Sequence, residues 1–255
     1  MTLAVDGLSF AYGRKPVLHD ISLPELKPGT LTALIGPNAT GKSTLFKCVA
    51  GLLKTVPGMV CFGGRAAASL GSRAWTEKVC YLPQAFTSNA ALTVFEIVLL
   101  ARKHGHGWRV EDGDVEAVAA VLRKLQIEHL AETFIGDLSG GQQQMASIAQ
   151  ALVRTPDIFL LDEPTSALDL RHQLEIMQTI QAVTRERGII TIVALHDLNL
   201  AVRFADTALL IRDGHLVADG SPADVMASEV LVETYGVQVE LHETPGGLLT
   251  VAARL

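Results

Sequence analysis

Short apolar runs alternate with helix-type patterns along most of the chain. Four runs are short and rich in aliphatic residues, as buried strands are, and they lie at 31–35, 78–82, 158–161 and 189–195. Between the first two runs, residues 43–53 carry apolar side chains at helical spacing, and Gly51 lies near the end of that pattern. Strands that alternate with helices predict an α/β fold with a mostly parallel sheet.

The pattern changes between residues 84 and 138, where residues 92–102 and 115–125 predict two amphipathic helices. We expect a single domain, 1–255, whose α/β core is formed by residues 1–84 and 154–228. Residues 85–153 form a helical subdomain inserted into this core. Residues 229–255 form a C-terminal hairpin extension that turns at Pro245-Gly246-Gly247.

Composition narrows the class of protein further. Hydrophobic residues make up 49% of the 255 residues, which is enough for a sizeable core, and the net charge of -6 argues against general nucleic-acid binding. No apolar run approaches the roughly 18 residues of a membrane span, and the N-terminus lacks the pattern of a signal peptide. Cys48, Cys61 and Cys80 fit neither a zinc pair nor a disulfide framework. His104 and His106, in a glycine-rich loop, are more typical of solvated residues than of a metal site.

One glycine-rich segment predicts a phosphate site. Residues 36–43, GPNATGKS, fit G-x-x-x-x-G-K-[ST] between an expected strand and an expected helix. In such a loop, backbone N–H groups and the positive end of the helix surround a phosphate chain. Lys42 would reach the β- and γ-phosphates, and the Ser43 hydroxyl would bind Mg²⁺.

Two carboxylates follow the expected strand 158–161, at the sheet edge where open α/β sheets bind ligands. Adjacent residues at a strand end point in different directions, so they can divide the work. We expect Asp162 to hold Mg²⁺, through water, and Glu163 to act as the general base that orients and deprotonates the attacking water.

A second glycine-rich segment, LSGGQ at 138–142, precedes another expected helix. Ser139 would lie at the start of this helix, and Gly140 and Gly141 would leave backbone amides open to an anion. An N-cap serine in a glycine-rich turn would give the same pattern without any ligand. Because this helix adjoins the helical block rather than the first phosphate loop, we expect it to bind the γ-phosphate held by a second copy. A two-fold dimer would then contain two equivalent composite sites.

LSGGQ, GPNATGKST and FLLDEPTSALD stand here in an order that resembles the nucleotide-binding subunit of ATP-binding cassette (ABC) transporters, over nearly the whole chain. The resemblance implies a P-loop NTPase (RecA-like) core, an N-terminal antiparallel β portion, an inserted helical subdomain, and ATP and Mg²⁺ as ligands. It implies that ATP is bound by Tyr12, Gly36, Pro37, Asn38, Ala39, Thr40, Gly41, Lys42, Ser43 and Thr44. It also implies that Leu138, Ser139, Gly140, Gly141 and Gln142 act on the ATP of a partner.

Single residues gain roles only from this resemblance. Tyr12 resembles the aromatic residue that stacks on adenine, and Asp169 the aspartate that communicates across the dimer. Gln84 resembles the glutamine that contacts Mg²⁺ and the attacking water and senses the membrane partner. His196 resembles the switch histidine at the γ-phosphate, which completes a catalytic set with Glu163 and Gln84. The implied metal ligands are Ser43, Gln84 and Asp162.

The segment 139–177 and the tail resemble the ATPases of importers for ferric siderophores, haem and cobalamin. The implied partners are a second copy, a separate membrane permease that docks near Gln84, and indirectly an extracytoplasmic substrate-binding protein. The chain would then lie on the cytoplasmic face of the membrane. Ferric siderophores, haem, cobalamin and metal ions stay open as cargo. Ala39 departs from the glycine of many cassettes, although alanine at this point also resembles the siderophore branch.

Two other classes of protein fit the sequence less well. A soluble cassette ATPase of translation or DNA repair would usually carry two cassettes or a long coiled-coil insertion, and the chain shows neither pattern. A P-loop GTPase would need an Asn-Lys-x-Asp motif, but Asn38, Asn89 and Asn199 are not followed by lysine.

Overall fold

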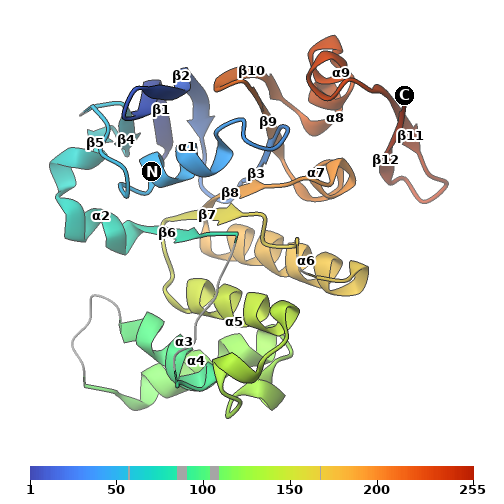
Figure 1. Ribbon diagram of the computed structural model, residues 1–255. Helices are drawn as coiled ribbons and strands as arrows, with labels where there is room; N and C mark the ends of the chain where they lie inside the picture. The colour runs from blue at the N-terminus through green and yellow to red at the C-terminus, as the bar shows by residue number, and fades with distance from the viewer. Residues whose placement is uncertain (57, 85–90, 104–108, 167) are drawn as a thin grey trace.

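The computed structural model describes residues 1–255 except 57, 85–90, 104–108 and 167 (Figure 1). His104 and His106, weighed above as metal ligands, lie outside the described residues. In the described part of the chain, no helix is long and apolar enough to cross a membrane.

A six-stranded sheet forms the centre of the molecule, in the order β10-β9-β3-β8-β7-β6. Its strands are β3 (Leu31–Ile35), β6 (Val79–Leu82), β7 (Ile158–Asp162), β8 (Ile190–Ala194), β9 (Thr207–Arg212) and β10 (His215–Gly220). All neighbours pair in parallel except β9 with β10. Every residue of β3, β7 and β8 is buried, as expected for a parallel sheet covered on both faces. The α/β fold and its mostly parallel sheet are confirmed.

Alternate residues of these strands enter two different cores. Leu34, Leu160 and Ile192 pack with helix α1 (Lys42–Val49) and with a second, antiparallel sheet of order β2-β1-β4-β5. That sheet contains β1 (Leu3–Tyr12), β2 (Lys15–Leu26), β4 (Val60–Phe62) and β5 (Arg65–Ala66), and is followed by η1 (Ala67–Leu70) and α2 (Ser72–Lys78). It is the antiparallel portion that was expected at the N-terminus.

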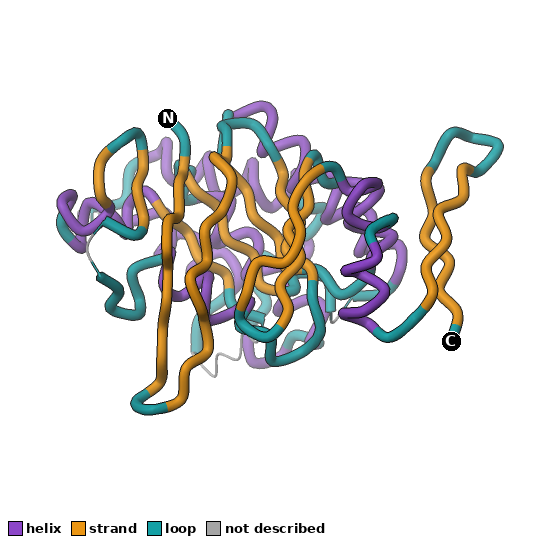
Figure 2. Tube along the Cα trace, turned by 90° about the horizontal axis from the view of Figure 1, so that it is seen from above, coloured by secondary structure: helices purple, strands orange, loops and turns teal. Residues whose placement is uncertain are grey.

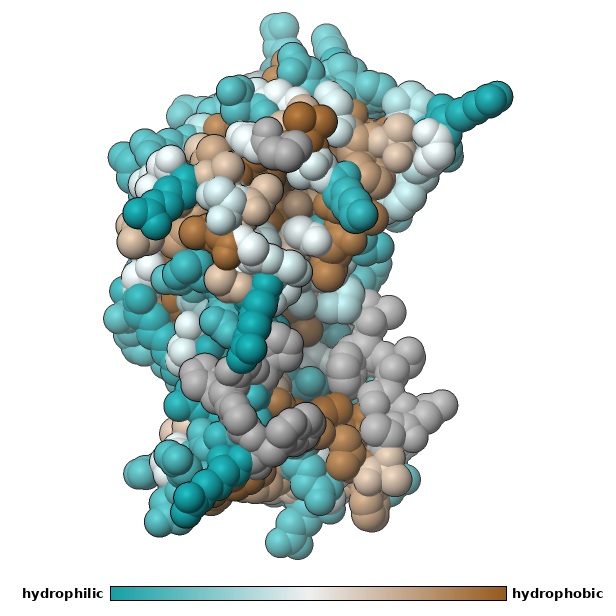
Figure 3. All heavy atoms as spheres, turned by 90° about the vertical axis from the view of Figure 1, so that its left-hand side faces the viewer, coloured by the Kyte–Doolittle hydropathy of each residue, from teal (hydrophilic) through white to brown (hydrophobic). Residues whose placement is uncertain are grey.

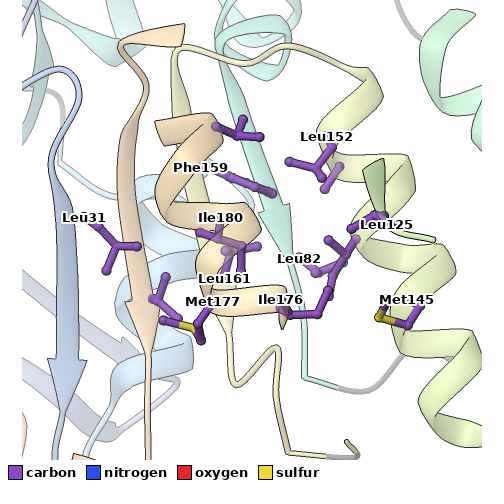
Figure 4. Packing of buried hydrophobic residues seen from close by; sticks show 14 of the residues in the cluster. Leu31, Leu82, Leu125, Met145, Leu152, Phe159, Leu161, Ile176, Met177 and Ile180 are labelled. Carbon is purple, nitrogen blue, oxygen red and sulfur yellow. The ribbon is translucent and has the colours of Figure 1, made fainter. Parts of the chain in front are cut away.

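Helices cover the opposite face of the central sheet. They are α5 (Gly140–Val153), α6 (Leu170–Arg187) and α7 (Leu198–Phe204). Helices α3 (Val94–Lys103) and α4 (Asp112–Lys124) pack against α5, and the short turns η2 (Glu128–Leu130) and η3 (Ile135–Asp137) lie between α4 and α5 in the chain. Figure 4 shows Leu125, Met145 and Leu152 pointing toward Leu161 of the sheet and Ile180 of α6. All five belong to one continuous cluster of buried side chains. The helical block therefore shares a core with the sheet.

The C-terminal part consists of α7 (Leu198–Phe204), α8 (Pro222–Met226), α9 (Glu229–Tyr235), β11 (Gln238–Glu243) and β12 (Leu249–Arg254). A hairpin does form, with its turn at 244–248, and Figure 2 shows it at one end of the molecule. The prediction that the extension is a hairpin from residue 229 onward is wrong for about its first quarter, residues 229–235, which form helix α9. Ser228 caps this helix, Gly236 ends it at φ 68°, and the buried Leu231 anchors it.

Candidate functional site

The glycine-rich loop between β3 and α1 has a backbone that side chains could not adopt. Gly36 has φ 148°, and a Cβ there would lie 2.2 Å from the Ile211 carbonyl oxygen. Gly41 has φ 104°, and its Cβ would lie 2.7 Å from Leu18 Cδ2. These two positions require glycine because larger residues would collide with packed strands.

The interior of this loop is fixed by its own polar groups. The Thr40 hydroxyl donates to the Pro37 carbonyl at 3.0 Å, and Gly214 N–H donates to the Thr40 carbonyl at 3.2 Å. Lys42 Nζ donates to the carbonyls of Gly36 at 2.6 Å and Pro37 at 2.9 Å, so the ammonium group lies inside the loop. The exposed Asn38 and Ala39 form the tip, beyond which Ser43 and Thr44 lie in the first turn of α1.

Buried charges surround Lys42. Desolvation by burial lowers the pKa of this ammonium group, whereas the carboxylates of Glu163 and Asp162 act in the opposite direction. A buried cation with two nearby carboxylates, in a glycine-rich loop that leads into a helix, is suited to a phosphate chain that carries a divalent cation.

Asp162 ends β7 with only 2% of its surface exposed. The Tyr81 hydroxyl donates to its Oδ2 at 3.1 Å, while its buried Oδ1 has no hydrogen-bond partner among the described residues. Burial raises the pKa of this carboxyl group, and the hydroxyls of Ser43 and Tyr81 oppose that effect. An unpartnered carboxylate oxygen close to a serine hydroxyl fits Mg²⁺, which prefers oxygen ligands.

Side chains that follow the ends of three strands meet at the Glu163 carboxylate. Gln84 Nε2 donates to its Oε2, and His196 Nε2 bonds to its Oε1. Gln84 follows β6, Glu163 follows β7 and His196 follows β8, so the parallel sheet brings the three to one edge. The three residues expected to be catalytic therefore lie together, beside the phosphate loop.

The second glycine-rich segment lies at the start of α5. Ser139 is the N-cap: its Oγ accepts from Gln142 N–H, and its own N–H donates to Gln142 Oε1 at 2.9 Å. Gly140 and Gly141 form the first turn, and Leu138 is buried just before it.

A cavity of about 700 Å³ opens beside this helix start. Ser139, Gly141, Gln142, Asp169 and His172 belong to its lining, and no residue of the phosphate loop does. This cavity therefore does not extend to the phosphate loop. Asp169 is the N-cap of α6 and accepts from His172 N–H at 2.9 Å, a bond that lowers the pKa of its carboxyl group.

Tyr12, the expected adenine contact, lies at the end of β1 with 47% of its surface exposed. Its ring meets that of Phe10 edge to face, with centroids 5.0 Å apart. Such a supported and accessible ring can accept a planar base.

Sequence analysis missed two polar residues that touch this site. Tyr81 holds Asp162, as described above, and Gln144 Nε2 donates to the carbonyl of Pro164, the residue after Glu163, at 3.2 Å. The sequence does contain an indication of Gln144, because it is a polar residue within the buried face of α5. The sequence contains no such indication of Tyr81, because tyrosines are common in strands and usually only pack there.

Comparison with known proteins agrees with this geometry. The family model described as ABC transporter matches residues 18–166. The ferric enterobactin transport ATP-binding protein of Escherichia coli is 35% identical over 243 residues, which cover 93% of this chain and 88% of that protein. The hemin import ATP-binding protein of Bordetella parapertussis is 36% identical over 268 residues and covers 100% of both chains.

A solved structure gives the same result at the level of the fold. It is a dimeric ATP-binding cassette in a post-hydrolysis state, bound to ADP and Pi, with a TM-score of 0.76 and 27% identity. The match covers 87% of this chain and 99% of that one. The chain belongs to the ABC transporter family, as an ATP-hydrolysing subunit related to the ATP-binding proteins of ferric enterobactin transport and hemin import.

Proposed function

We propose that two copies of this chain enclose two ATP molecules and that hydrolysis takes place at Glu163. The observation that carries this proposal is the convergence of Gln84 and His196 on the Glu163 carboxylate, at the sheet edge next to the phosphate loop. A carboxylate held on both sides can orient a water molecule and take its proton.

Within one chain, the loop amides and Lys42 bind the phosphates. His196 contacts the γ-phosphate, and Tyr12 stacks on adenine. Ser43, Asp162 and Gln84 would hold Mg²⁺, which when bound neutralises charge on the phosphates. The partnerless Oδ1 of Asp162 supports this ligand set.

The second copy completes each site. The amides at Gly140 and Gly141, capped by Ser139, would bind the γ-phosphate held by the partner, and Asp169 would transmit closure across the dimer. The cavity beside these residues does not extend to the chain's own phosphate loop, which supports the arrangement. ATP then shifts the equilibrium between an open and a closed dimer, which can drive a coupled protein.

The coupled protein is a membrane permease that docks on the helical block near Gln84, at the cytoplasmic face of the membrane. Apolar side chains lie in the lower, helical part of the face shown in Figure 3 as well as in its upper part. On this block, Leu100 and Phe134 expose 41% and 50% of their surfaces. An extracytoplasmic binding protein would deliver the cargo.

The relatives support import of a ferric siderophore, since one of them serves ferric enterobactin transport. Hemin is the second candidate, because a relative named for hemin import covers the whole chain. Cobalamin and metal ions are further alternatives.

The dimer is tested with Glu163→Gln. This variant should bind ATP and Mg²⁺ but lose turnover by at least roughly a hundredfold, as expected for loss of a general base. With ATP it should elute as a dimer in size-exclusion chromatography with light scattering. Lys42→Ala, which cannot hold the phosphates, should stay monomeric. A Glu163→Gln chain that stays monomeric at saturating ATP would contradict the enclosed-ATP dimer.

Cargo is tested in the source cells by replacing the chain with its Glu163→Gln variant. Uptake of labelled iron from a ferric siderophore should fall to the level of a deletion strain, while hemin uptake continues. Loss of hemin uptake alone would mean that the cargo is hemin and not a ferric siderophore. No change in either would contradict both assignments.

A further inference from the structure

Three consecutive glutamines in the first turns of α5 make three different sets of hydrogen bonds. Gln142 closes the cap with Ser139. Gln143 Nε2 donates to the carbonyls of Ile135 at 3.1 Å and Leu138 at 3.4 Å, in the segment before the helix. Gln144 Nε2 donates across to Pro164, 20 residues away in sequence. Successive helical residues point about 100° apart, which sends the three amides to different neighbours.

Burying the Gln144 side chain costs free energy of folding. Only 4% of its surface is exposed, and its helix buries Met145, Ile148 and Leu152 in the core. An amide in such a place destabilises the fold unless it is hydrogen-bonded, so an apolar residue would pack there at less cost. The bond to Pro164 is therefore what compensates for burying this amide.

The turn that Gln144 holds is strained. Glu163 has φ 52°, a left-handed conformation that residues other than glycine seldom adopt. Ser166 donates to the Glu163 carbonyl through both its N–H, at 3.3 Å, and its hydroxyl, at 3.1 Å. Gln144 adds a contact from α5 to this turn, one residue beyond Glu163. The direction of the Glu163 carboxylate thus depends partly on the position of α5.

The far end of α5 contacts the strand that leads to Gln84. Arg154 donates to the Thr76 carbonyl at 2.7 Å and contacts Cys80 Sγ at 3.6 Å. A hydrogen-bonded helix moves as one body, so a displacement of its first turn reaches both contacts.

We propose that Gln144 is a positioning residue that links the two composite sites of the dimer. This inference rests on the proposed function, in which the first turn of α5 binds the partner's ATP while Glu163 acts on the chain's own ATP. When α5 moves onto the partner's γ-phosphate, its amide at Gln144 carries the Pro164 carbonyl with it and brings Glu163 into position. Binding of the partner's ATP by one chain thereby controls when that chain's Glu163 hydrolyses its own ATP.

The test compares Gln144→Met with Gln181→Met in the purified full chain. Methionine keeps the volume and the flexible, unbranched shape of glutamine and removes the side-chain amide, including the donor to Pro164. Gln181 Nε2 also donates to a backbone carbonyl, that of Phe204, at 2.7 Å, but it joins α6 to the end of α7. It is therefore a matched control for losing an amide-to-carbonyl bond away from the site.

We measure the rate of ATP hydrolysis against ATP concentration, and nucleotide binding by fluorescence. The unmodified chain and Gln181→Met should show a Hill coefficient near about 2, the limit for two linked sites. In Gln144→Met it should fall toward about 1, and turnover should fall by roughly tenfold to a hundredfold, as for a misplaced catalytic group. Nucleotide binding should be unchanged.

A Gln144→Met chain with the normal Hill coefficient would overturn the inference while the unmodified chain still hydrolyses ATP as a dimer. Absence of both dimer and hydrolysis in the unmodified chain would instead overturn the proposed function. If Gln144→Met does not fold, Gln144→Glu replaces it. Its buried carboxyl has a raised pKa and can donate to Pro164 only when protonated, so cooperativity should return as the pH is lowered from about 8 to about 6. A pH-independent Hill coefficient in this variant would also overturn the inference.

Discussion

At the scale of single residues, two non-glycine residues at the phosphate loop and the adjoining sheet edge, among those that the structure describes, adopt left-handed backbone. Glu163 has φ 52° and Ala39 has φ 63°. Each such residue costs roughly 1–2 kcal/mol. For Glu163, the strain aims a carboxylate at the sheet edge, where Gln84 and His196 meet it. Ala39 lies at the exposed tip of the phosphate loop, with no such contact to justify it.

Ala39→Gly should therefore stabilise the protein. Relief of the left-handed strain outweighs the greater entropy of glycine in the unfolded chain, for a net gain of about 0.5 kcal/mol. Thermal unfolding should show a small rise in Tm. The matched control is Ala117→Gly in α4, where glycine costs roughly 1 kcal/mol and Tm should fall. A lower Tm for Ala39→Gly would mean that the alanine methyl makes a stabilising contact.

At the scale of elements, the start of α5 serves two purposes that one substitution would confuse. Ser139 caps the helix, and the open amides of its first turn are proposed to bind a phosphate. Aspartate caps as well as serine does, but its charge repels an anion, whereas alanine does not cap and carries no charge.

Ser139→Asp should keep the free energy of unfolding, while Ser139→Ala should lower it by about 1 kcal/mol. Hydrolysis should be weakest in Ser139→Asp, because a second negative charge faces the partner's γ-phosphate. Chemical denaturation and a steady-state ATPase assay measure the two quantities separately. Full activity in Ser139→Asp would reduce this serine to a simple helix cap.

The elements predicted from sequence were those with a strong local pattern. The first strand, 31–35, was predicted to the residue, and the other three lie within one residue of β6, β7 and β8 at each end. Strands β9 and β10 were not predicted, although Asp213-Gly214 joins them with positive φ at both residues, the usual signal of a tight hairpin. Helix α9 was missed because it has only seven residues, which are too few to show a helical pattern of apolar positions.

At the scale of the whole molecule, the C-terminal hairpin is joined to the core through α7. Asn199 accepts from Val251 N–H at 2.8 Å and donates to the Val251 carbonyl at 3.4 Å, so its side chain pairs with β12 as a neighbouring strand would. Asn199 lies three residues after His196. A two-stranded hairpin is marginally stable alone, so this attachment matters.

Asn199→Ala should loosen the hairpin without unfolding the sheet. Amide hydrogen exchange should speed up across β11 and β12, because the lost pair of hydrogen bonds contributes about 1–2 kcal/mol to their docking. Exchange in β3, β7 and β8 should not change. Asn199→Asp, which keeps the acceptor for Val251 N–H, should give an intermediate result. Equal protection in all three chains would show that apolar packing alone holds the hairpin.

The sequence also predicted the three residues that meet at the sheet edge, but not the polar contacts that support them. Asp162, Glu163 and the phosphate loop carry short motifs that chemistry makes recognisable. The bonds of Tyr81 to Asp162 and of Gln144 to Pro164 join residues 81 and 20 positions apart, and a single sequence carries no pattern for such pairs. Long-range polar contacts follow from how the elements pack, and that depends on the whole core.

Helix α5 has consequences for how this protein can be re-engineered or can diverge. Its 14 residues span about 21 Å, and together with its C-cap, Arg154, the helix contacts the segment before it, the Glu163 turn and the strand that leads to Gln84. A helix transplanted from a relative would arrive without its matching carbonyls. Hybrids that exchange α5 together with β6 and residues 163–166 should work where exchange of the helix alone fails. The segments that must be kept together for function are therefore larger than the LSGGQ motif by which the family is recognised.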